Sequence, residues 1–183
     1  MKRLIVSACL LAVATILPAQ MAKKPPLSPP AKASVTVNGK TITIDYNSPR
    51  VRGREGTIFT KDGLIEKTHK SYPVWRAGAN AATTLKTSAD LTIGDLKVPA
   101  GTYTLFIDIS NPDKWVLIVS KDTGEWGLAY DHTKDLGRTD MHMSKPPAMV
   151  EDLVWRLTSR GADHGRMSIE WENMRASVPF TVH

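Results

Sequence analysis

Residues 34–46 read Ser-Val-Thr-Val-Asn-Gly-Lys-Thr-Ile-Thr-Ile-Asp-Tyr, and they decide the fold class. On both sides of Asn38-Gly39, apolar residues alternate with polar ones, which is the period of a β-strand that buries one face. Asn-Gly favours the type I′ turn, the two-residue connection between antiparallel strands, because both of its positions need a positive φ. The stretch therefore predicts a β-hairpin.

Two more hairpins are predicted further along the chain. Residues 102–109 and 115–119 are rich in β-branched and aromatic side chains and flank the turn-forming tripeptide Asn111-Pro112-Asp113. Residues 153–157 and 167–171 flank a glycine-containing loop in the same way. We therefore expect antiparallel strands that are joined by short turns.

The closing run, residues 176–182, is a further predicted strand. Pro179 places it at a sheet edge, because proline cannot donate a hydrogen bond to a neighbouring strand. No long segment has a helical period. Short strands bounded by turns predict a mostly β fold: a single antiparallel β-sandwich or flattened, jelly-roll-like barrel with little helix.

The N-terminus has the layout of a secretory signal peptide, which we expect at residues 1–20. Lys2-Arg3 form a basic start, and residues 4–17 form a nearly unbroken apolar run that is shorter than the about 20 residues needed to span a bilayer. The small residue Ala19 suits cleavage. The mature chain is therefore expected to begin near Gln20, to have no membrane span, and to work in the periplasm or outside the cell.

A proline-rich spacer at residues 21–33 follows, and its fixed φ angles favour an extended linker. Residues 34–183 then have the length of a single β domain. The only cysteine, Cys9, lies in the expected signal peptide, and the apolar run continues beyond it, unlike in a lipoprotein signal. After cleavage the domain would have no thiol for disulfides, metal ligation or catalysis.

The formal net charge of the chain is +6, of which Lys2 and Arg3 contribute two, and no acidic residue lies in the first twenty positions. The mature domain is therefore mildly basic, at +4. It has no Lys/Arg-rich run with interleaved aromatic residues, so nucleic acid is not an expected partner. The sequence gives no indication of the oligomeric state.

Several segments, in a fixed order along the chain, carry a family resemblance. They are Ser48-Pro49-Arg50-Val51-Arg52-Gly53-Arg54, residues 74–83, residues 98–105, Trp115, residues 122–127, Tyr130 and Ser177-Val178-Pro179. In these segments the chain resembles the exported bacterial family catalogued as domain of unknown function 2911. The resemblance implies an exported β domain and supplies no activity. Residues 63–72 depart from the family pattern by being longer and richer in lysine.

Two of these segments contain a candidate anion-binding site. Three arginines fall at alternate positions in the first segment, so an extended backbone would place their guanidinium groups on one side, although Pro49 and Gly53 make a loop equally compatible. If the second segment forms a loop beside it, the two would line a pocket for carboxylate, phosphate or sulfate, which guanidinium groups bind bidentately. The candidate ligand-binding residues are Arg50, Arg52, Arg54, Trp75, Arg76 and Asn80.

An alternative role for these arginines is structural. In that interpretation they pair with Asp45, Glu55 or Glu170 and fix loops to the sandwich, since ion-pair networks of this kind are common. The five tryptophans have a similar pair of interpretations. They suit a sugar-stacking surface, but four of five are expected to be at least half buried, with Trp75 and Trp126 as the candidates for exposure.

No metal or cofactor is expected. His132, His142 and His164 are too scattered for their spacing to indicate a metal site. The sequence lacks the Gly-x-Ser-x-Gly, Ser-x-x-Lys, phosphate-loop and dinucleotide-binding glycine motifs. Without these motifs, the common enzyme classes are less expected, but catalysis of another kind is not excluded.

The function is therefore unknown from sequence, and three hypotheses are carried forward. The first is a non-catalytic exported module that binds an anionic small molecule or an envelope glycan. The second is a hydrolase of unrecognised type that acts on a phosphorylated or sugar substrate, with arginines that stabilise the transition state. The third is a structural component of an envelope assembly. A pocket that joins the arginines favours catalysis if it holds a carboxylate or histidine, and binding if it holds neither.

Overall fold

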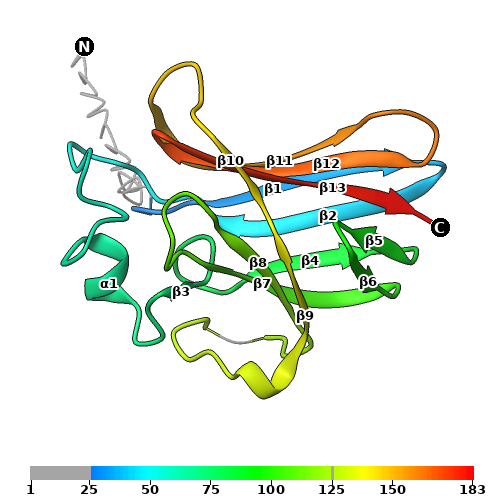
Figure 1. Cartoon of the computed structure of the whole chain (residues 1–183), viewed down its shortest axis with the longest axis horizontal. Coiled ribbons are helices and arrows are strands. Elements are labelled where there is room, and N and C mark those ends of the chain that lie inside the picture. Colours follow the sequence, from blue (N-terminus) through cyan, green and yellow to red (C-terminus); the bar gives the residue numbers. More distant parts are fainter. Residues whose placement is uncertain (1–25, 125) are drawn as a thin grey trace, which may run out of the picture.

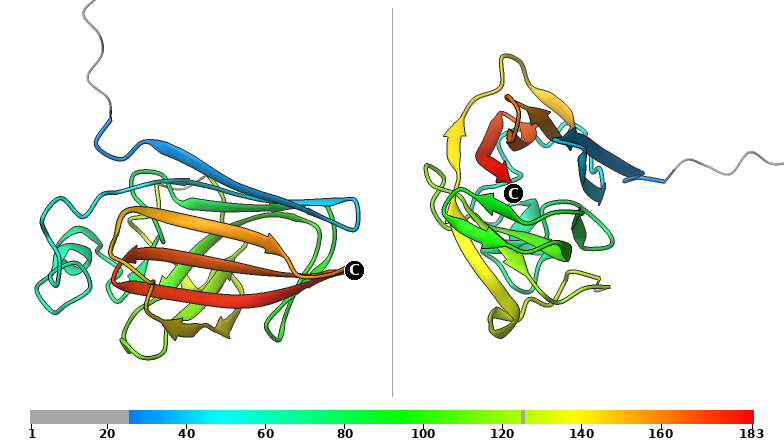
Figure 2. Two further views of the ribbon diagram at one scale, coloured as in Figure 1. Left: turned by 90° about the horizontal axis from the view of Figure 1, so that it is seen from above. Right: turned by 90° about the vertical axis from the view of Figure 1, so that its right-hand side faces the viewer.

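The computed structural model describes residues 26–124 and 126–183, so the expected signal peptide at 1–20 lies outside the described residues. Of the described residues, 51% are in strands and 5% in helices. Two antiparallel sheets pack against each other without closing into a barrel, as Figures 1 and 2 show. The mostly β prediction is confirmed, and of its two forms the sandwich is the one observed.

The first sheet contains the N-terminal hairpin. Its strands are β1 (Pro30–Val37), β2 (Lys40–Asn47), β3 (Val74–Trp75), β4 (Thr83–Thr87), β7 (Gly101–Asp108), β8 (Val116–Ser120) and β9 (Asp135–Asp140). Their order is β1-β2-β4-β7-β8-β9, and β3 pairs with β7. Because β1 begins at Pro30, the last residues of the expected linker belong to this sheet.

The second sheet contains the C-terminal strands. They are β5 (Leu91–Ile93), β6 (Leu96–Val98), β10 (His142–Ser144), β11 (Val150–Ser159), β12 (His164–Glu172) and β13 (Met174–Val182). Their order is β11-β12-β13-β5-β6, with β10 paired to β13. In Figure 1 the long strands β11, β12 and β13 lie above β4, β7 and β8 of the first sheet.

All three predicted hairpins are confirmed. Strands β1 and β2 pair around Asn38 and Gly39, whose φ angles of 49° and 70° are those of the predicted turn. Strands β7 and β8 form the second hairpin, and β11 and β12 form the third. Local turn chemistry and period-2 alternation therefore specified these pairings.

The position of Pro179 corrects one prediction. Strand β13 is not an edge strand, because it pairs with β12 on one side and with β10 and β5 on the other. The pairing with β10 ends at Ser177 and that with β5 begins at Phe180, so Pro179 lies in the gap between them. Its carbonyl oxygen accepts from Gly94 on this side, where the missing N–H costs no strand pairing.

The core lies between the sheets and contains a cluster of aromatic side chains. The rings of Trp75 and Trp171 stack with centroids 6.0 Å apart, and Phe59 packs against both and against Trp115. Trp75 is fully buried, so its predicted exposure is wrong: its strand, β3, pairs with β7 and faces the core. Trp126 is 60% exposed, and the prediction that four of five tryptophans are buried is confirmed.

The chain between β2 and β3, residues 48–73, leaves the sheets and covers one end of the sandwich. This segment contains the helix α1 (Leu64–Thr68) and lies opposite the C-terminus in Figure 1. It is tied to β11 at its start, where Val51 N donates to Glu151 O and Leu153 N donates to Pro49 O, both at 2.9 Å. Within the described residues, no helix is long and apolar enough to cross a membrane.

Candidate functional site

A pocket of about 230 Å³ lies in the end segment and contains the predicted arginines. Four parts of the chain line it: the loop 49–54, the helix α1 with His69 after it, the loop 76–79, and Trp171 at the end of β12. Leu27 and Ser28, just before β1, complete the lining. The two segments that the sequence singled out are therefore brought together at one site.

Arg50, Arg52 and Arg54 all line the pocket, but from a turn and not from an extended strand. The φ angles of Arg52 and Gly53, 52° and 70°, reverse the chain there, so the extended alternative is wrong. The guanidinium of Arg50 is directed to Asp152, with Nε 2.5 Å from Oδ1. Of the three, Arg50 is thus the one whose charge is compensated by a described carboxylate.

Arg52 and Arg54 bond to backbone carbonyl groups instead. Arg54 donates from Nε to Val51 O at 2.9 Å and from Nη2 to Arg50 O at 2.6 Å. Arg52 donates from Nη2 to Leu27 O at 3.2 Å. Among the described residues, neither forms an ion pair with a carboxylate. Both therefore bring guanidinium groups that no described carboxylate pairs with, although the Glu151 carboxylate accepts from the backbone N–H of Arg52 at 3.0 Å.

Arg76 is the most buried of the four pocket arginines, with 8% of its surface exposed. Its Nη1 donates to Asn80 O at 2.6 Å and to Trp126 O at 3.0 Å, and burial lowers the pKa of its guanidinium. No ion pair to Arg76 is formed within the described part of the chain. Burying such a charge without a counterion is costly, and a bound anion would offset that cost.

The other two candidate residues shape the site without lining it. Trp75 is in the core, and its Nε1 donates to Gly78 O at 3.2 Å, which holds the loop that follows Arg76. Asn80 is exposed, and its Nδ2 donates to Ser28 O at 3.3 Å. Both positions were predicted as ligand contacts, but neither lines the pocket.

The alternative prediction, that these arginines pair with Asp45, Glu55 or Glu170, is wrong. Asp45 pairs with two lysines of the first sheet, and Glu170 pairs with Arg156 and Arg175. Among the described ion pairs, none involves Glu55. These carboxylates therefore do not compensate the charge of the pocket.

His69 is a pocket residue that the sequence reasoning missed. It is 6% exposed, and burial, followed by the positive charge of Arg76, lowers its pKa to about 4. No helix was predicted here, so the four-residue spacing of Ile65 and His69 carried no signal; His69 follows α1 directly as its C-cap. Its ring is held against this helix end, where Nδ1 lies 3.2 Å from the carbonyl oxygen of the buried Ile65.

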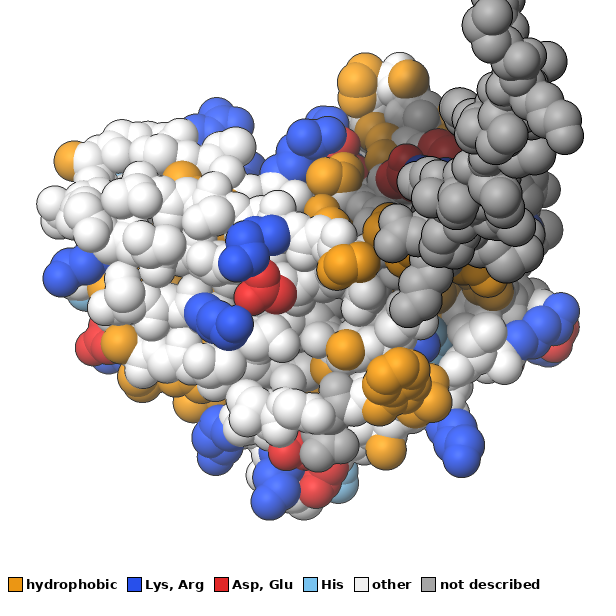
Figure 3. Space-filling model, turned by 180° about the vertical axis from the view of Figure 1, so that it is seen from behind, with side chains coloured by type: hydrophobic (Ala, Val, Ile, Leu, Met, Phe, Trp, Pro, Cys, Tyr) orange, Lys and Arg blue, Asp and Glu red, His pale blue; other side chains and the backbone are white. Residues whose placement is uncertain are grey.

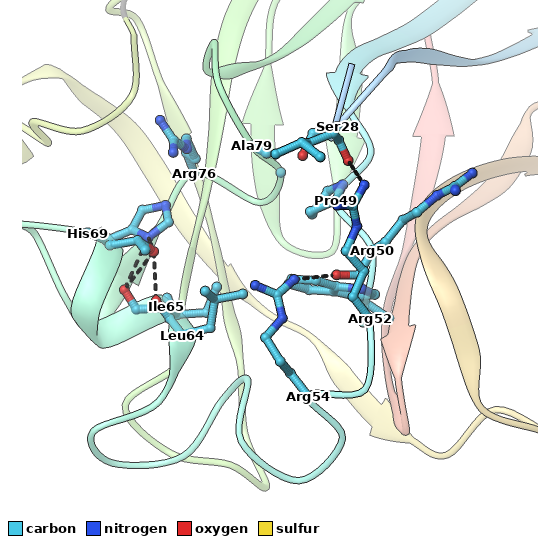
Figure 4. A pocket seen from close by; sticks show the side chains of 14 residues that line it. Ser28, Pro49, Arg50, Arg52, Arg54, Leu64, Ile65, His69, Arg76 and Ala79 are labelled. Atoms are coloured by element: carbon cyan, nitrogen blue, oxygen red, sulfur yellow. Dashed lines mark hydrogen bonds between the residues drawn. The ribbon is translucent and has the colours of Figure 1, made fainter. Parts of the chain in front are cut away.

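Three unpartnered polar atoms belong to residues that line this pocket. Across residues 26–124 and 126–183, four buried side-chain nitrogen or oxygen atoms have no hydrogen-bond partner, and three of them are His69 Nε2, Arg76 Nε and Trp171 Nε1. Figure 4 shows His69 and Arg76 on one side of the pocket and Arg52 and Arg54 on the other. Buried polar groups are normally paired, so the concentration of unpaired ones on residues of this pocket singles out this part of the molecule.

One known protein family matches the part of the chain that forms the pocket. The family model described as protein of unknown function DUF2911 matches residues 28–180, which include the whole pocket lining except Leu27. The chain belongs to this family. No curated protein and no solved structure matches the chain. The DUF2911 family carries no described activity, so the chemistry of the site has to be argued from its own residues.

The pocket of this DUF2911 domain suits an anion better than a metal ion. No Asp or Glu lines it among the residues that the structure describes. Within the same residues, no three His, Cys, Asp or Glu side chains form a cluster suited to a metal. His132, His142 and His164 lie outside the pocket. On the face shown in Figure 3, basic and acidic side chains are interspersed, whereas the described lining of the pocket has four arginines and no carboxylate.

Proposed function

We propose that this DUF2911 domain binds a small anionic molecule through its arginine pocket. The observation that carries the proposal is that Arg52, Arg54 and Arg76 line one pocket and donate to backbone carbonyls, with no described carboxylate paired to them. Guanidinium groups in proximity repel one another, and a bound anion removes that repulsion. Their forked donors match carboxylate, phosphate and sulfate groups.

The size of the pocket favours a small ligand over a long glycan. Its volume of about 230 Å³ is below the roughly 300–1,000 Å³ of sites for drug-sized molecules. Leu64, Ile65 and Trp171 supply apolar surface beside the arginines. This combination suits one anionic group on a compact body.

We further propose that binding takes place outside the cytoplasm. The support is the signal-like layout of residues 1–20, with its basic start and apolar run. An anionic metabolite or a charged group of an envelope component is available in that compartment.

The test is a thermal melt of the mature domain with inorganic phosphate, against chloride at matched ionic strength. Phosphate is expected to raise the melting temperature by mass action, with a smaller rise in Arg54→Gln and Arg76→Gln. Arg160→Gln is the matched control, because Arg160 is exposed and does not line the pocket. This variant removes the same charge outside the pocket, so its melting temperature shows how much phosphate stabilises the protein by a general salt effect. Equal shifts in all four proteins would contradict the proposal.

A histidine in the arginine pocket is the feature that the sequence analysis expected of the second function, the hydrolase. His69 lies in the pocket, and in a hydrolase its imidazole would take a proton from an attacking water while the arginines hold the charge of the transition state. A general base works best when its pKa lies near the operating pH, whereas the pKa of His69 is held to about 4. We therefore rank binding first. Release of 4-nitrophenol from 4-nitrophenyl phosphate that His69→Phe abolishes would reverse this order.

A further inference from the structure

The hydrogen bonds around His69 fix which of its nitrogens carries the proton. Nδ1 lies 3.2 Å from the carbonyl oxygen of Ile65, which can only accept, so Nδ1 must be the donor. Nδ1 also lies 3.0 Å from Thr68 Oγ1, and the hydroxyl proton of Thr68 is used in a 2.7 Å hydrogen bond to Leu64 O. Both neighbours therefore require the Nδ1–H tautomer.

It follows that Nε2 of His69 is unprotonated and can only accept a hydrogen bond. The low pKa of the ring agrees with a neutral imidazole at neutral pH. Nε2 is buried and has no partner among the described residues, and the residue lines the pocket. Nε2 is enclosed by its neighbours, so a ligand in the pocket can supply the donor only when the side chains around this nitrogen shift to open it toward the pocket.

The other unpartnered groups on the same walls have the opposite polarity. Arg76 Nε and Trp171 Nε1 are both donors, and both residues line the pocket. The pocket thus offers donors for negatively charged oxygens and one acceptor for a proton. A fully deprotonated oxyanion satisfies the donors but leaves His69 Nε2 facing another set of lone pairs.

We infer that the pocket selects oxyanions that also carry an O–H group, with His69 Nε2 accepting the hydrogen bond from that O–H. This inference rests on the proposed function and adds the class of ligand to it. Two kinds of small molecule share this chemistry: a phosphate group that retains a proton, and a carboxylate with a neighbouring hydroxyl. Sulfate at neutral pH has no proton and belongs to neither kind.

The experiment compares ligand pairs that differ in the O–H group. Isothermal titration of the wild-type mature domain with phosphate and with sulfate at neutral pH tests the proton on the oxyanion itself. Glycolate and acetate test a hydroxyl on the neighbouring carbon. The O–H member of at least one pair is expected to bind about tenfold tighter or more, because a buried acceptor left without a donor is costly.

His69→Phe removes the acceptor while keeping a flat ring in the buried position. In this variant the preference is expected to fall to about twofold or less, while binding of the anion without an O–H persists through the arginines. His142→Phe is the control, because His142 is exposed and outside the pocket. A measurement on the wild type supports the assignment independently of the variant: the ¹⁵N resonance of His69 Nε2 is expected at the value of an unprotonated nitrogen and should move on addition of phosphate.

The outcomes separate this inference from the function on which it rests. Equal binding within both pairs overturns the selection of O–H groups and leaves anion binding in place. A preference that persists in His69→Phe, or an Nε2 resonance that phosphate does not move, overturns the role of His69. Absence of binding by all four ligands overturns the proposed function itself.

Discussion

Trp155 donates its indole N–H to the carbonyl oxygen of Ala77, with an N···O distance of 3.0 Å. Trp155 belongs to β11 of the second sheet, whereas Ala77 lies in the loop next to Arg76. Ala77 has a φ of 54°, and Thr83 of the first sheet also donates to its carbonyl oxygen, at 3.1 Å. Hydrogen bonds from both sheets thus hold a non-glycine residue in the left-handed conformation and fix the loop that positions Arg76.

Replacing Trp155 is therefore expected to affect both stability and binding. Trp155→Phe removes the donor and reduces the packed volume, and we expect the free energy of unfolding in urea to fall by about 2 kcal/mol. The phosphate-induced rise in melting temperature is expected to shrink with it. Trp126→Phe is the control, because this side chain is 60% exposed and should change stability by no more than about 0.5 kcal/mol. Equal losses in the two variants would remove the special role of Trp155.

The burial of His69 predicts a pH dependence of stability. An unfolded histidine takes up its proton near pH 6.5, but folded His69 does so only near pH 4. Between these values the unfolded state binds more protons, so the free energy of unfolding should fall as the pH is lowered from 6.5 to 4, by up to about 3 kcal/mol. Arg76 contributes to this shift, since its positive charge disfavours a second one beside it.

Chemical denaturation at several pH values checks this prediction by comparing variants. In His69→Phe the slope between pH 6.5 and 4 should be shallower than in the wild type, whereas His142→Phe should keep it. Asp45, whose pKa is lowered although burial opposes the effect of its lysine partners, titrates below this window in every variant and cancels in the comparison. Identical slopes in wild type and His69→Phe would show that the pKa of His69 is the same in the folded and unfolded states.

The pocket arginines are expected to differ in their effect on anion binding. The Nε of Arg50 is paired with Asp152, whereas Arg54 bonds to backbone carbonyls alone among the described residues. Arg50→Gln should therefore change the phosphate dissociation constant by less than about threefold, while Arg54→Gln should raise it about tenfold. The Arg50–Asp152 pair is about half exposed, so its loss should cost less than about 1 kcal/mol of stability. A larger effect of Arg50→Gln than of Arg54→Gln on binding would refute this ranking.

The N-terminal prediction concerns processing in the cell. Because Lys2-Arg3 and the apolar run at 4–17 form a signal-like layout, the chain expressed in a bacterial host should be exported and cut near Gln20. Mass spectrometry of the periplasmic fraction should find a mature chain without lipid. An acylated chain that begins at Cys9 would instead establish a lipoprotein.

The sequence determined the local structure because the relevant interactions are short in range. Alternation on both sides of Asn38-Gly39 defines which face of each strand is buried, and the positive φ angles of the turn define the pairing. Alternate spacing singled out Arg50, Arg52 and Arg54, and a glycine-containing segment singled out Arg76; the fold brings all four to one pocket. Residue type alone indicated the chemistry of these side chains, because a guanidinium is charged in almost any environment.

Only the tertiary structure decided what surrounds those side chains. Trp75 looked exposed beside Gly78, but the pairing of β3 with β7 buries it, and Pro179 avoids an edge because two short strands leave a gap beside it. His69 gains its meaning from contacts that no local pattern contains: Arg76 beside it and a pocket in front of it. Burial and pairing are sums over residues distant in sequence, so a pattern read along the chain predicts the strand but not its environment.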